Sequence, residues 1–572
     1  MLHPITLLLP LLATSNQGGD PRDLYDVQAY EMQWAVVPDD QRLEGRVVVR
    51  ARTLGKDFDR VTLDMVADLE LLGVSTEDGT ELQAEREDDY VHITLPAALD
   101  AGTDFAVALR YRGNPKAEDS FSGFHWAQTR AGRPWINTSC QGLGAHSWWP
   151  CKASFFNAGD KPERVEVELT VPKGLTGVSN GRFQGSSTGG PDWFTAEGDW
   201  ETFRYVHPYP LETYSVTLNV APYVKVEQQL MIDGGGDTGV PFVYYVLPES
   251  VEKAAVQFQD VPGMIDAFAQ AFGPWPFPES KIGLVETNFW GMEHSSAVAY
   301  GSSYPAWCER EGQPDPHAGP NRYFDYILIH EMAHEWWGNA VSATDWGHFW
   351  IHEGLGTYAE GSYLEFTEGR ERADEYFRGQ NRRASRLKGA LYRGEDVTSG
   401  KAYSQVIYSK GACVLNTLRS YIDDDESWWR LLHEFQARYR YKNANTADFF
   451  ALVEGVTGTN YDWFSEQYVY GEGSPRLKVD IEVEPRLIKL RIDNEIGDFD
   501  CGIDVRWLEG GEPRTDRIWV RGGKSGGSDY VLGDDPSQVE VLHIDRIIGR
   551  HTVNIHGYGV PEAAPEESSD DD

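Results

Sequence analysis

The sequence predicts a multidomain α+β protein, and three observations lead to this fold class. The chain has 572 residues, which is too long for one hydrophobic core. Polar and apolar residues alternate in short segments near both ends of the chain, a pattern typical of β-strands, whereas apolar residues in the middle recur at helical spacing. Hydrophobic residues make up 41 % of the chain and aromatic residues 12 %, enough for packed interiors throughout the main body.

Residues 1–19 are predicted to be a signal peptide. The apolar run from Ile5 to Ala13 (ITLLLPLLA) is long enough for the core of a signal peptide and too short to span a bilayer. Ala13 and Ser15 supply the small residues of a cleavage site, although no Lys or Arg precedes the run. We therefore expect a periplasmic or extracellular protein, and a cytoplasmic one if this segment is not a functional signal. No other stretch is apolar enough for stable membrane insertion.

Three folded regions follow. Strand-like segments such as RVVVRARTL and FAVALRYRG, separated by turn residues, predict a large N-terminal β-sheet domain over residues 20–232. Helical periodicity, as in NRYFDYILIHEMAHEWWGNAV, predicts a mixed α/β domain over residues 233–472. Alternation returns in RLKVDIEVEP and LIKLRIDN and predicts a C-terminal β-sandwich over residues 473–556. Residues 557–572 form an acidic tail without aromatic residues, which we expect to be disordered.

Net charge and cysteine usage exclude two classes of function. The formal net charge is −39, which repels nucleic acid and anionic membranes, so we expect no nucleic-acid partner. Charge alone does not distinguish adaptation to salt from attraction of cationic ligands. The cysteines contain no C-x-x-C pair, so a cysteine-built metal site is not expected. We expect buried thiols, although an exported protein would allow a Cys140–Cys151 bridge. The cysteines are Cys140, Cys151, Cys308, Cys413 and Cys501.

The strongest chemical signal is the pentad HEMAH at residues 330–334. Residues four apart share one face of a helix, so the imidazoles of His330 and His334 can reach the same metal ion. Glu331 lies beside them, where it can take a proton from water. A catalytic zinc site requires three protein ligands and an open position. Glu353, in the helix-like segment WIHEGLGTYAEG, can supply the third ligand if the chain returns antiparallel to the first helix.

These motifs resemble those of the aminopeptidase N family of zinc metallopeptidases, which includes leukotriene hydrolase. HEMAHEWWGN followed by FWIHEG matches the family pattern of H-E-x-x-H and a Glu within W-L-N-E-G, except that His352 replaces the family's Asn. The resemblance implies a thermolysin-like catalytic domain and one Zn²⁺ per chain. It implies that His330, His334 and Glu353 hold the metal and that Glu331 is the general base.

A second family motif, G-x-M-E-N, corresponds to WGMEH at residues 290–294, in which the Met and the Glu match. The resemblance implies that Glu293, on an edge strand of the cleft, binds the free α-ammonium group of the substrate. A protonated His294 would oppose this ammonium group, whereas a neutral imidazole is compatible with it. Gln141 occupies the place of a family residue that also holds the ammonium group. The implied substrate-binding residues are Gln141, Gly291, Met292 and Glu293.

A third family motif is a tyrosine in the context Y-x-K-G-A, which Tyr408 matches in YSKGA. The resemblance implies that its hydroxyl stabilises the oxyanion of the tetrahedral intermediate. Tyr403 is a weaker candidate for this role. Glu335 and Asp345 are interpreted either as hydrogen-bond partners of the metal-binding histidines or as solvated carboxylates.

The remaining polar and aromatic residues near the motifs are interpreted as structural. His348 and His352 flank Glu353, but three metal ligands are already assigned, so we expect both to support the fold. The pair Trp336 and Trp337 is expected to pack in the core rather than to form a shelf for substrate.

The sequence as a whole predicts a zinc aminopeptidase that acts on peptides with a free N-terminus. Larger family members continue into a helical domain that covers the cleft, but no helical pattern follows residue 475, so no helical cap is expected. Two alternatives stay open: a zinc hydrolase of the same fold with endopeptidase or epoxide hydrolase specificity, and a non-catalytic binding protein on a peptidase scaffold. The sequence carries no signal for the oligomeric state or for the preferred N-terminal side chain.

Overall fold

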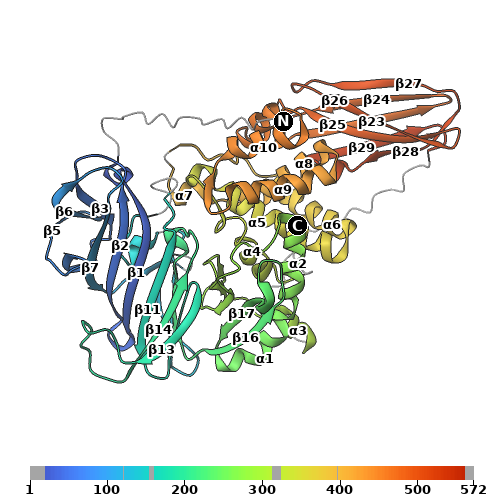
Figure 1. Cartoon of the computed structure of the whole chain (residues 1–572). Coiled ribbons are helices and arrows are strands. Elements are labelled where there is room, and N and C mark those ends of the chain that lie inside the picture. The colour runs from blue at the N-terminus through green and yellow to red at the C-terminus, as the bar shows by residue number, and fades with distance from the viewer. Residues whose placement is uncertain are drawn as a thin grey trace, which may run out of the picture.

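The computed structural model in Figure 1 describes residues 20–119, 122–142, 144–153, 160–311, 324–395, 397–496 and 498–560. The chain forms a β-rich N-terminal region (blue to cyan), a largely helical centre (green to orange) and a second β-rich region (red). The helical centre lies between the two β-rich regions (Figure 1). The predicted signal segment, residues 1–19, and the predicted tail from residue 561 onward lie outside the described residues, whereas Gly557 ends the last strand.

The N-terminal region is built from three sheets whose apolar faces share one core. Within the largest sheet, β1 and β11 pair in parallel and the other neighbouring strands are antiparallel. The seven-stranded sheet has the order β13 (Arg182–Thr188), β14 (Trp200–His207), β11 (Arg164–Pro172), β1 (Tyr25–Val37), β2 (Arg42–Thr53), β7 (Asp104–Gly113) and β4 (Glu70–Thr76). The five-stranded sheet has the order β12 (Thr176–Ser179), β15 (Leu218–Ala221), β10 (Pro134–Ser139), β9 (Ser122–Gln128) and β8 (Ala117–Asp119). The three-stranded sheet has the order β3 (Phe58–Asp64), β6 (Tyr90–Leu99) and β5 (Gln83–Glu87).

A second five-stranded sheet opens the central region and ends at the edge strand that directly precedes Glu293. Its order is β16 (Val224–Leu230), β17 (Val240–Val246), β18 (Ile282–Glu286), β20 (Val298–Tyr300) and β19 (Gly291–Met292). The predicted boundary at residue 232 falls after β16, although β16 pairs along its whole length with β17. The alternating pattern of β16 resembles that of the preceding strands, so the sequence pattern does not reveal which sheet it joins.

The helices of the central region surround α5, whose residues are mostly buried because it packs against α2, α4, α6 and α8. A short parallel pair, β21 (Val341–Ala343) and β22 (Lys442–Ala444), ties two of the intervening loops together. The α-helices are α1 (Val251–Gln257), α2 (Val261–Phe272), α3 (Pro305–Arg310), α4 (Tyr326–Ala333), α5 (Trp350–Glu368), α6 (Arg370–Ala384), α7 (Ser399–Ala402), α8 (Gly411–Ile422), α9 (Asp425–Tyr439), α10 (Thr446–Thr457) and α11 (Asp462–Phe464). A π-helical turn, η9 (Val406–Lys410), leads directly into α8.

The C-terminal region consists of two sheets that contribute their apolar faces to one core. Buried residues alternate with exposed ones along β23 and β24, as expected for strands with one buried face. The four-stranded sheet has the order β27 (Gly526–Val531), β24 (Leu487–Asn494), β23 (Arg476–Glu484) and β29 (Arg550–Gly557). The three-stranded sheet has the order β26 (Glu512–Val520), β25 (Cys501–Glu509) and β28 (Pro536–Leu542).

All five cysteines are buried free thiols, so the Cys140–Cys151 bridge that we considered is not formed. The sulfur of Cys140 instead accepts a hydrogen bond from the indole of Trp148 at 2.8 Å. Among the helices of the described residues, none is both long enough and apolar enough to cross a membrane.

Two glycines allow α5 and α8 to cross at close range. A Cβ atom added to Gly411 would lie 2.7 Å from the Cα atom of Gly354, closer than non-bonded carbons approach. Because Gly411 begins α8 directly after η9, this crossing fixes the position of the π-helical turn against α5. The helix that carries Glu353 and the turn that carries Tyr408 are thus held together by backbone contact.

We predict that Gly411→Ala lowers the thermal-unfolding midpoint, because the added methyl group forces the two helices apart. Overpacking of this kind costs about 1–3 kcal/mol. The control is Gly455→Ala on α10, where an added Cβ meets no atom within 4 Å. That change should raise the midpoint slightly, because it removes only chain entropy of the unfolded state. Equal effects of the two substitutions would show that the crossing is not tightly packed.

Candidate metal centre and active-site cleft

The first two candidate ligands lie at the end of α4. The helix begins at an N-cap, Asp325, whose carboxylate accepts a hydrogen bond from the backbone of Leu328 at 3.4 Å. His330 lies within α4, and His334 is its C-cap with a backbone conformation that is still helical. The spacing of four residues therefore brings both imidazoles to the same face, with ring centroids 4.7 Å apart.

The third candidate ligand, Glu353, lies in the first turn of α5. Gly356, one turn further along, lets α5 approach the two imidazoles. A Cβ atom at this position would lie 3.0 Å from the Cε1 atom of His334 and 3.3 Å from that of His330. A larger residue there would push the carboxylate of Glu353 away from the histidines.

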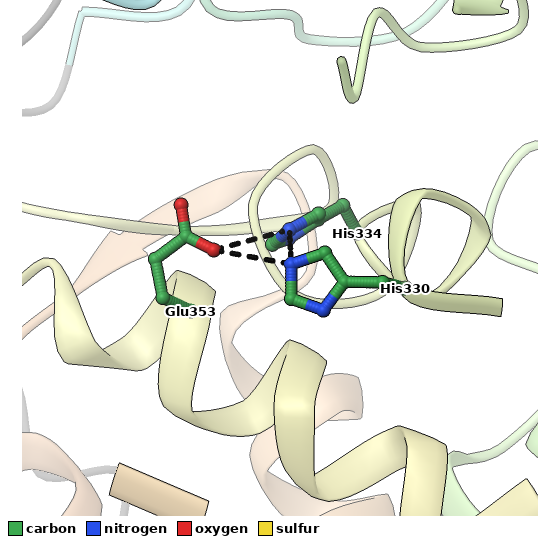
Figure 2. Close-up of side chains that lie close together, drawn as sticks. All are labelled: His330, His334 and Glu353. Atoms are coloured by element: carbon green, nitrogen blue, oxygen red, sulfur yellow. Dashed lines mark hydrogen bonds and ion pairs between the residues drawn. The ribbon is translucent and has the colours of Figure 1, made fainter. Parts of the chain in front are cut away.

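The donor atoms of the three side chains converge on one point (Figure 2). The Nε2 atoms of His330 and His334 are 3.1 Å apart, and they lie 3.3 Å and 3.4 Å from Oε2 of Glu353. A tetrahedral ion with ligand bonds of about 2.0–2.1 Å separates its ligand atoms by about 3.3–3.4 Å. The spacing of these donors therefore fits a tetrahedral zinc ion with one position open.

The hydrogen bonds of the two rings direct their lone pairs to the same point. Nδ1 of His330 lies 3.0 Å from Glu360, and Nδ1 of His334 lies 2.8 Å from the carbonyl oxygen of Trp337. Both Nδ1 atoms face acceptors and so carry the protons, which leaves both Nε2 atoms as donors to a metal. Burial opposes charge on His334, but the hydrogen bond to Glu353 outweighs it and raises the pKa of the ring to about 9. The site thus stabilises positive charge.

A buried chain of hydrogen bonds continues from His330 into α6. The hydroxyl of Tyr376 donates to the second oxygen of Glu360 at 2.7 Å, and the amide of Gln380 donates to that hydroxyl at 2.8 Å. The hydroxyl of Ser409 then donates to Oε1 of Gln380 at 2.9 Å. Because Ser409 lies in η9, this chain connects one candidate metal ligand to the π-helical turn.

Glu331 faces the cleft opposite the edge strand β19. Its carboxylate packs so closely on Gly291 that a Cβ there would lie 2.4 Å from Oε1. Burial raises the pKa of Glu331 to about 8. Oxygens of Glu331 and Glu293 and a ring nitrogen of His334 lie within 4.8 Å of one another. All of these side chains line a cavity of about 520 Å³, together with Met292.

Glu293 follows β19 directly and is anchored on both sides. Its Oε1 atom accepts a hydrogen bond from the amide of Gln141, which comes from the N-terminal region, and another from the hydroxyl of Tyr214 at 3.1 Å. The amide of Asn339 holds the backbone carbonyl of Glu293 at 2.8 Å. The structure therefore brings Gln141 and Glu293 together, and Gln141 also lies 3.5 Å from Oε1 of Glu353.

His294 carries no positive charge that would repel a cation bound at Glu293. The sequence leaves open whether its imidazole is protonated or neutral. The side chain is fully buried, and burial lowers the pKa of the imidazole to about 3, so the ring is neutral at physiological pH. Neither ring nitrogen has a hydrogen-bond partner among the described residues, and His294 does not belong to the lining of the cavity. The replacement of the family's Asn thus leaves the charge of the cleft unchanged.

Tyr408 lines the cavity, and its ring stacks beside His330 with centroids 5.9 Å apart. Burial and the charge of Glu353 raise the pKa of Tyr408 well above its ordinary value, so its hydroxyl keeps its proton and can donate. Tyr403 lies outside the cavity lining and packs against Trp346. The structure therefore favours Tyr408 over Tyr403 as the donor that faces the cleft.

Among the described residues, the carboxylates of Glu335 and Asp345 form no hydrogen bond with the imidazoles of His330 and His334. Glu335 is buried and accepts hydrogen bonds from the hydroxyl of Ser295 at 2.9 Å and the backbone of Ser296 at 2.6 Å, so it fixes the loop after Glu293. Asp345 accepts a hydrogen bond from the backbone of Gly347 at 2.7 Å and caps a short helix.

The flanking histidines and tryptophans are structural, as expected. His352 accepts a hydrogen bond from the backbone of Ala343 at 2.8 Å, and His348 bonds to the hydroxyl of Thr446 at 2.9 Å. Trp336 and Trp337 are fully buried in the core.

Sequence reasoning missed the buried residues that hold the candidate site in place. Only Glu360 had a usable signal, because it follows Glu353 by seven residues and therefore shares its face of α5. The others have no motif: they are distant in sequence and meet the site only in the folded chain. These residues are Tyr214, Asn339, Tyr376 and Gln380.

Comparison with known proteins agrees with the family resemblance of the motifs. Residues 257–468 match the peptidase family M1 domain. Endoplasmic reticulum aminopeptidase 1 of Rattus norvegicus is 23 % identical over 386 residues, which cover 65 % of this chain and 39 % of the relative. Aminopeptidase N of Homo sapiens is 23 % identical over 369 residues, which cover 61 % of this chain and 36 % of the relative. The chain thus spans well under half the length of these curated relatives.

Solved structures share the fold. An M1 zinc metallopeptidase from Deinococcus radiodurans superposes with a TM-score of 0.64 at 20 % identity, covering 78 % of this chain and 93 % of that structure. A two-domain M1 zinc metallopeptidase mutant bound to L-arginine has a TM-score of 0.60 at 21 % identity, covering 76 % of this chain and 91 % of that structure. The resemblance predicted from the motifs is confirmed: residues 257–468 of this chain are a peptidase family M1 domain, homologous to aminopeptidase N and endoplasmic reticulum aminopeptidase 1.

Proposed function

We propose that the chain is a zinc-dependent aminopeptidase that removes the N-terminal residue from peptides. One observation carries the proposal: the buried carboxylate of Glu293, held by Gln141 and Tyr214, lies beside the three metal donors in the same cavity. Oxygens of Glu293 and Glu331 and a ring nitrogen of His334 lie within 4.8 Å of one another, so a free α-ammonium group bound to Glu293 brings the first peptide bond of the substrate to the metal. The M1 domain and the aminopeptidase relatives support the same activity.

In this proposal His330, His334 and Glu353 hold one Zn²⁺. When bound, the ion supplies Lewis-acid chemistry, which polarises the scissile carbonyl and acidifies water. Glu360 and the carbonyl of Trp337 keep the two imidazoles in the tautomer that binds metal. The close fit of the donor spacing to tetrahedral geometry supports the assignment.

Glu331 takes the proton of the attacking water and passes it to the leaving amine as the C–N bond breaks. Burial raises its pKa to about 8, which brings the affinity of the carboxylate for a proton closer to that needed for a group that accepts and releases one. Tyr408 donates its hydroxyl proton in a hydrogen bond to the oxyanion of the tetrahedral intermediate. Gly291 and Met292 form the wall of the cleft along which the substrate backbone lies.

The proposal also includes the substrates and the division of the chain into domains. Peptides with a free N-terminus are the proposed substrates. The division into domains at residues 20–232, 233–472 and 473–556 is proposed with the correction that β16 belongs to the sheet of the central region. Export directed by residues 1–19 stays a prediction from the sequence.

Replacing the general base should separate metal binding from catalysis. We predict that Glu331→Gln retains one zinc per chain by elemental analysis and lowers kcat by about 10²–10⁴-fold, because the ligands are intact and proton transfer is lost. Removing the metal from the wild type with a chelator should abolish hydrolysis, and adding Zn²⁺ should restore it. Near-normal turnover of the variant would exclude Glu331 as the base.

The hydrogen bond from His330 to Glu360 should tune metal affinity. We predict that Glu360→Gln weakens zinc binding by about 10–100-fold, because the neutral amide oxygen that replaces the carboxylate is a weaker acceptor for the Nδ1–H of His330. Competition with a fluorescent chelator measures the affinity directly. The matched control is Glu368→Gln on the same helix, an exposed carboxylate that forms an ion pair with Arg372. Unchanged affinity in Glu360→Gln would contradict the assignment.

The free amine of the substrate provides the direct test of exopeptidase activity. We predict that wild-type enzyme cleaves a free-amine peptide efficiently and its N-acetylated counterpart hardly at all. Glu293→Gln preserves the shape of the side chain and should lower kcat/KM for the free amine by about 10–100-fold, because a charge-assisted hydrogen bond is lost. Comparable cleavage of matched free and acetylated peptides by the wild type would refute the aminopeptidase assignment and leave endopeptidase activity in its place.

A further inference from the structure

The described residues that line the cavity include four carboxylates and one permanent cation. Glu293, Glu331, Glu353 and Glu360 all line it. Among the described residues of the lining, Arg383 is the one Lys or Arg. Its side chain is exposed and forms no ion pair with any carboxylate in the described part of the chain. An unpaired arginine at the cleft of a protein with net charge −39 requires an explanation.

Glu293 and the helix that carries Arg383 approach different metal donors, because Glu293 lies near His334 and α6 is linked to His330. Glu293 and Gln141 lie on the side of Glu353, whereas the opposite side of His330 faces Glu360. Glu360 in turn contacts α6 through Tyr376. Arg383 follows Gln380 by three residues on α6, so its side chain begins about one helical turn beyond this network.

The segment around Arg383 is also locally basic. Residues 376–394 contain no Asp or Glu, although acidic residues outnumber basic ones by 90 to 51 in the whole chain. Such a reversal of charge beside the mouth of the cavity attracts anionic groups from solution. The basic residues of this segment are Arg378, Arg382, Arg383, Arg386, Lys388 and Arg393.

We infer that Arg383 binds a carboxylate of the substrate on the leaving-group side of the scissile bond. This inference rests on the proposed aminopeptidase function, because it assumes that Glu293 fixes the substrate's N-terminus. The enzyme then prefers short peptides whose own C-terminal carboxylate reaches Arg383. Guanidinium groups bind carboxylates through two parallel hydrogen bonds, which gives direction as well as attraction. An acidic side chain at the second or third residue has the same chemistry, and the experiment separates the two sources.

The test compares matched tripeptides within each enzyme variant. Leu-Ala-Ala as the free acid is compared with its C-terminal amide, and Leu-Ala-Glu amide with Leu-Ala-Gln amide. An exposed arginine–carboxylate pair is worth about 0.2–1 kcal/mol, and a two-point pair somewhat more, so we expect the wild type to favour the free acid about two- to tenfold in kcat/KM. The preference should fall as ionic strength rises.

Arg383→Gln should remove the preference for the free acid, and Arg383→Glu should reverse it. Arg382→Gln is the matched control: Arg382 is the neighbouring exposed arginine, lacks an ion pair in the described part of the chain and is not in the cavity lining, so the preference should persist. A preference for Leu-Ala-Glu amide without one for the free acid would assign the site to acidic side chains rather than to the C-terminus. That outcome would overturn the inference of a short-peptide enzyme.

Failure of the Arg383 site can be distinguished from failure of the proposed aminopeptidase function. If the wild type shows no preference within either pair of peptides, the aminopeptidase stands and the carboxylate site is refuted. The site is refuted as well if Arg383→Gln keeps the wild-type ratio. If no free-amine peptide is cleaved, binding of the acid and the amide to the zinc-loaded chain by calorimetry still tests Arg383, and equal affinities refute the site.

Discussion

The close approach of α4 and α5 is the constraint on which the rest of the candidate site depends. Two helices can bring three donor atoms within 3.4 Å only where one of them presents no side chain at the crossing, and Gly356 provides this point. Gly354 and Gly411 likewise allow α5 and α8 to approach closely. The central helix is thereby fixed against both neighbours through backbone atoms, whose positions are more exact than those of flexible side chains.

The chemistry of the cleft follows from an excess of buried negative charge. Carboxylates in a largely buried cavity are costly unless cations compensate them. Two cations suit the arrangement: a metal ion at the histidines and Glu353, and an ammonium group at Glu293. In the proposed function, the same group of carboxylates therefore attracts both the metal ion and the substrate's ammonium group. Each of these cations lowers the pKa of the carboxylates beside it and so favours their ionised form.

The motifs allowed the metal donors, Glu331, Glu293, Gln141 and Tyr408 to be placed in one cleft, because spacing along a helix and family resemblance both act on short stretches of sequence. The order of β-rich, helical and β-rich regions was likewise accessible from periodicity. The sheet to which β16 belongs could not be predicted from periodicity, because the alternation of its residues is the same whichever strand it pairs with. The neutrality of His294 and the bonds of Glu335 depend on burial, which single-sequence patterns do not report.

Gln141 brings the N-terminal region into contact with Glu293, although all three candidate metal donors come from the helical centre. A fragment that begins at β16 would keep the complete set of donors together with Glu331 and Tyr408. It would lose the amide of Gln141 and the hydroxyl of Tyr214, both of which donate hydrogen bonds to Glu293. In the proposed function, the group that binds the substrate's N-terminus therefore lies with the metal donors, and the side chains that orient it come from the preceding stretch of the chain.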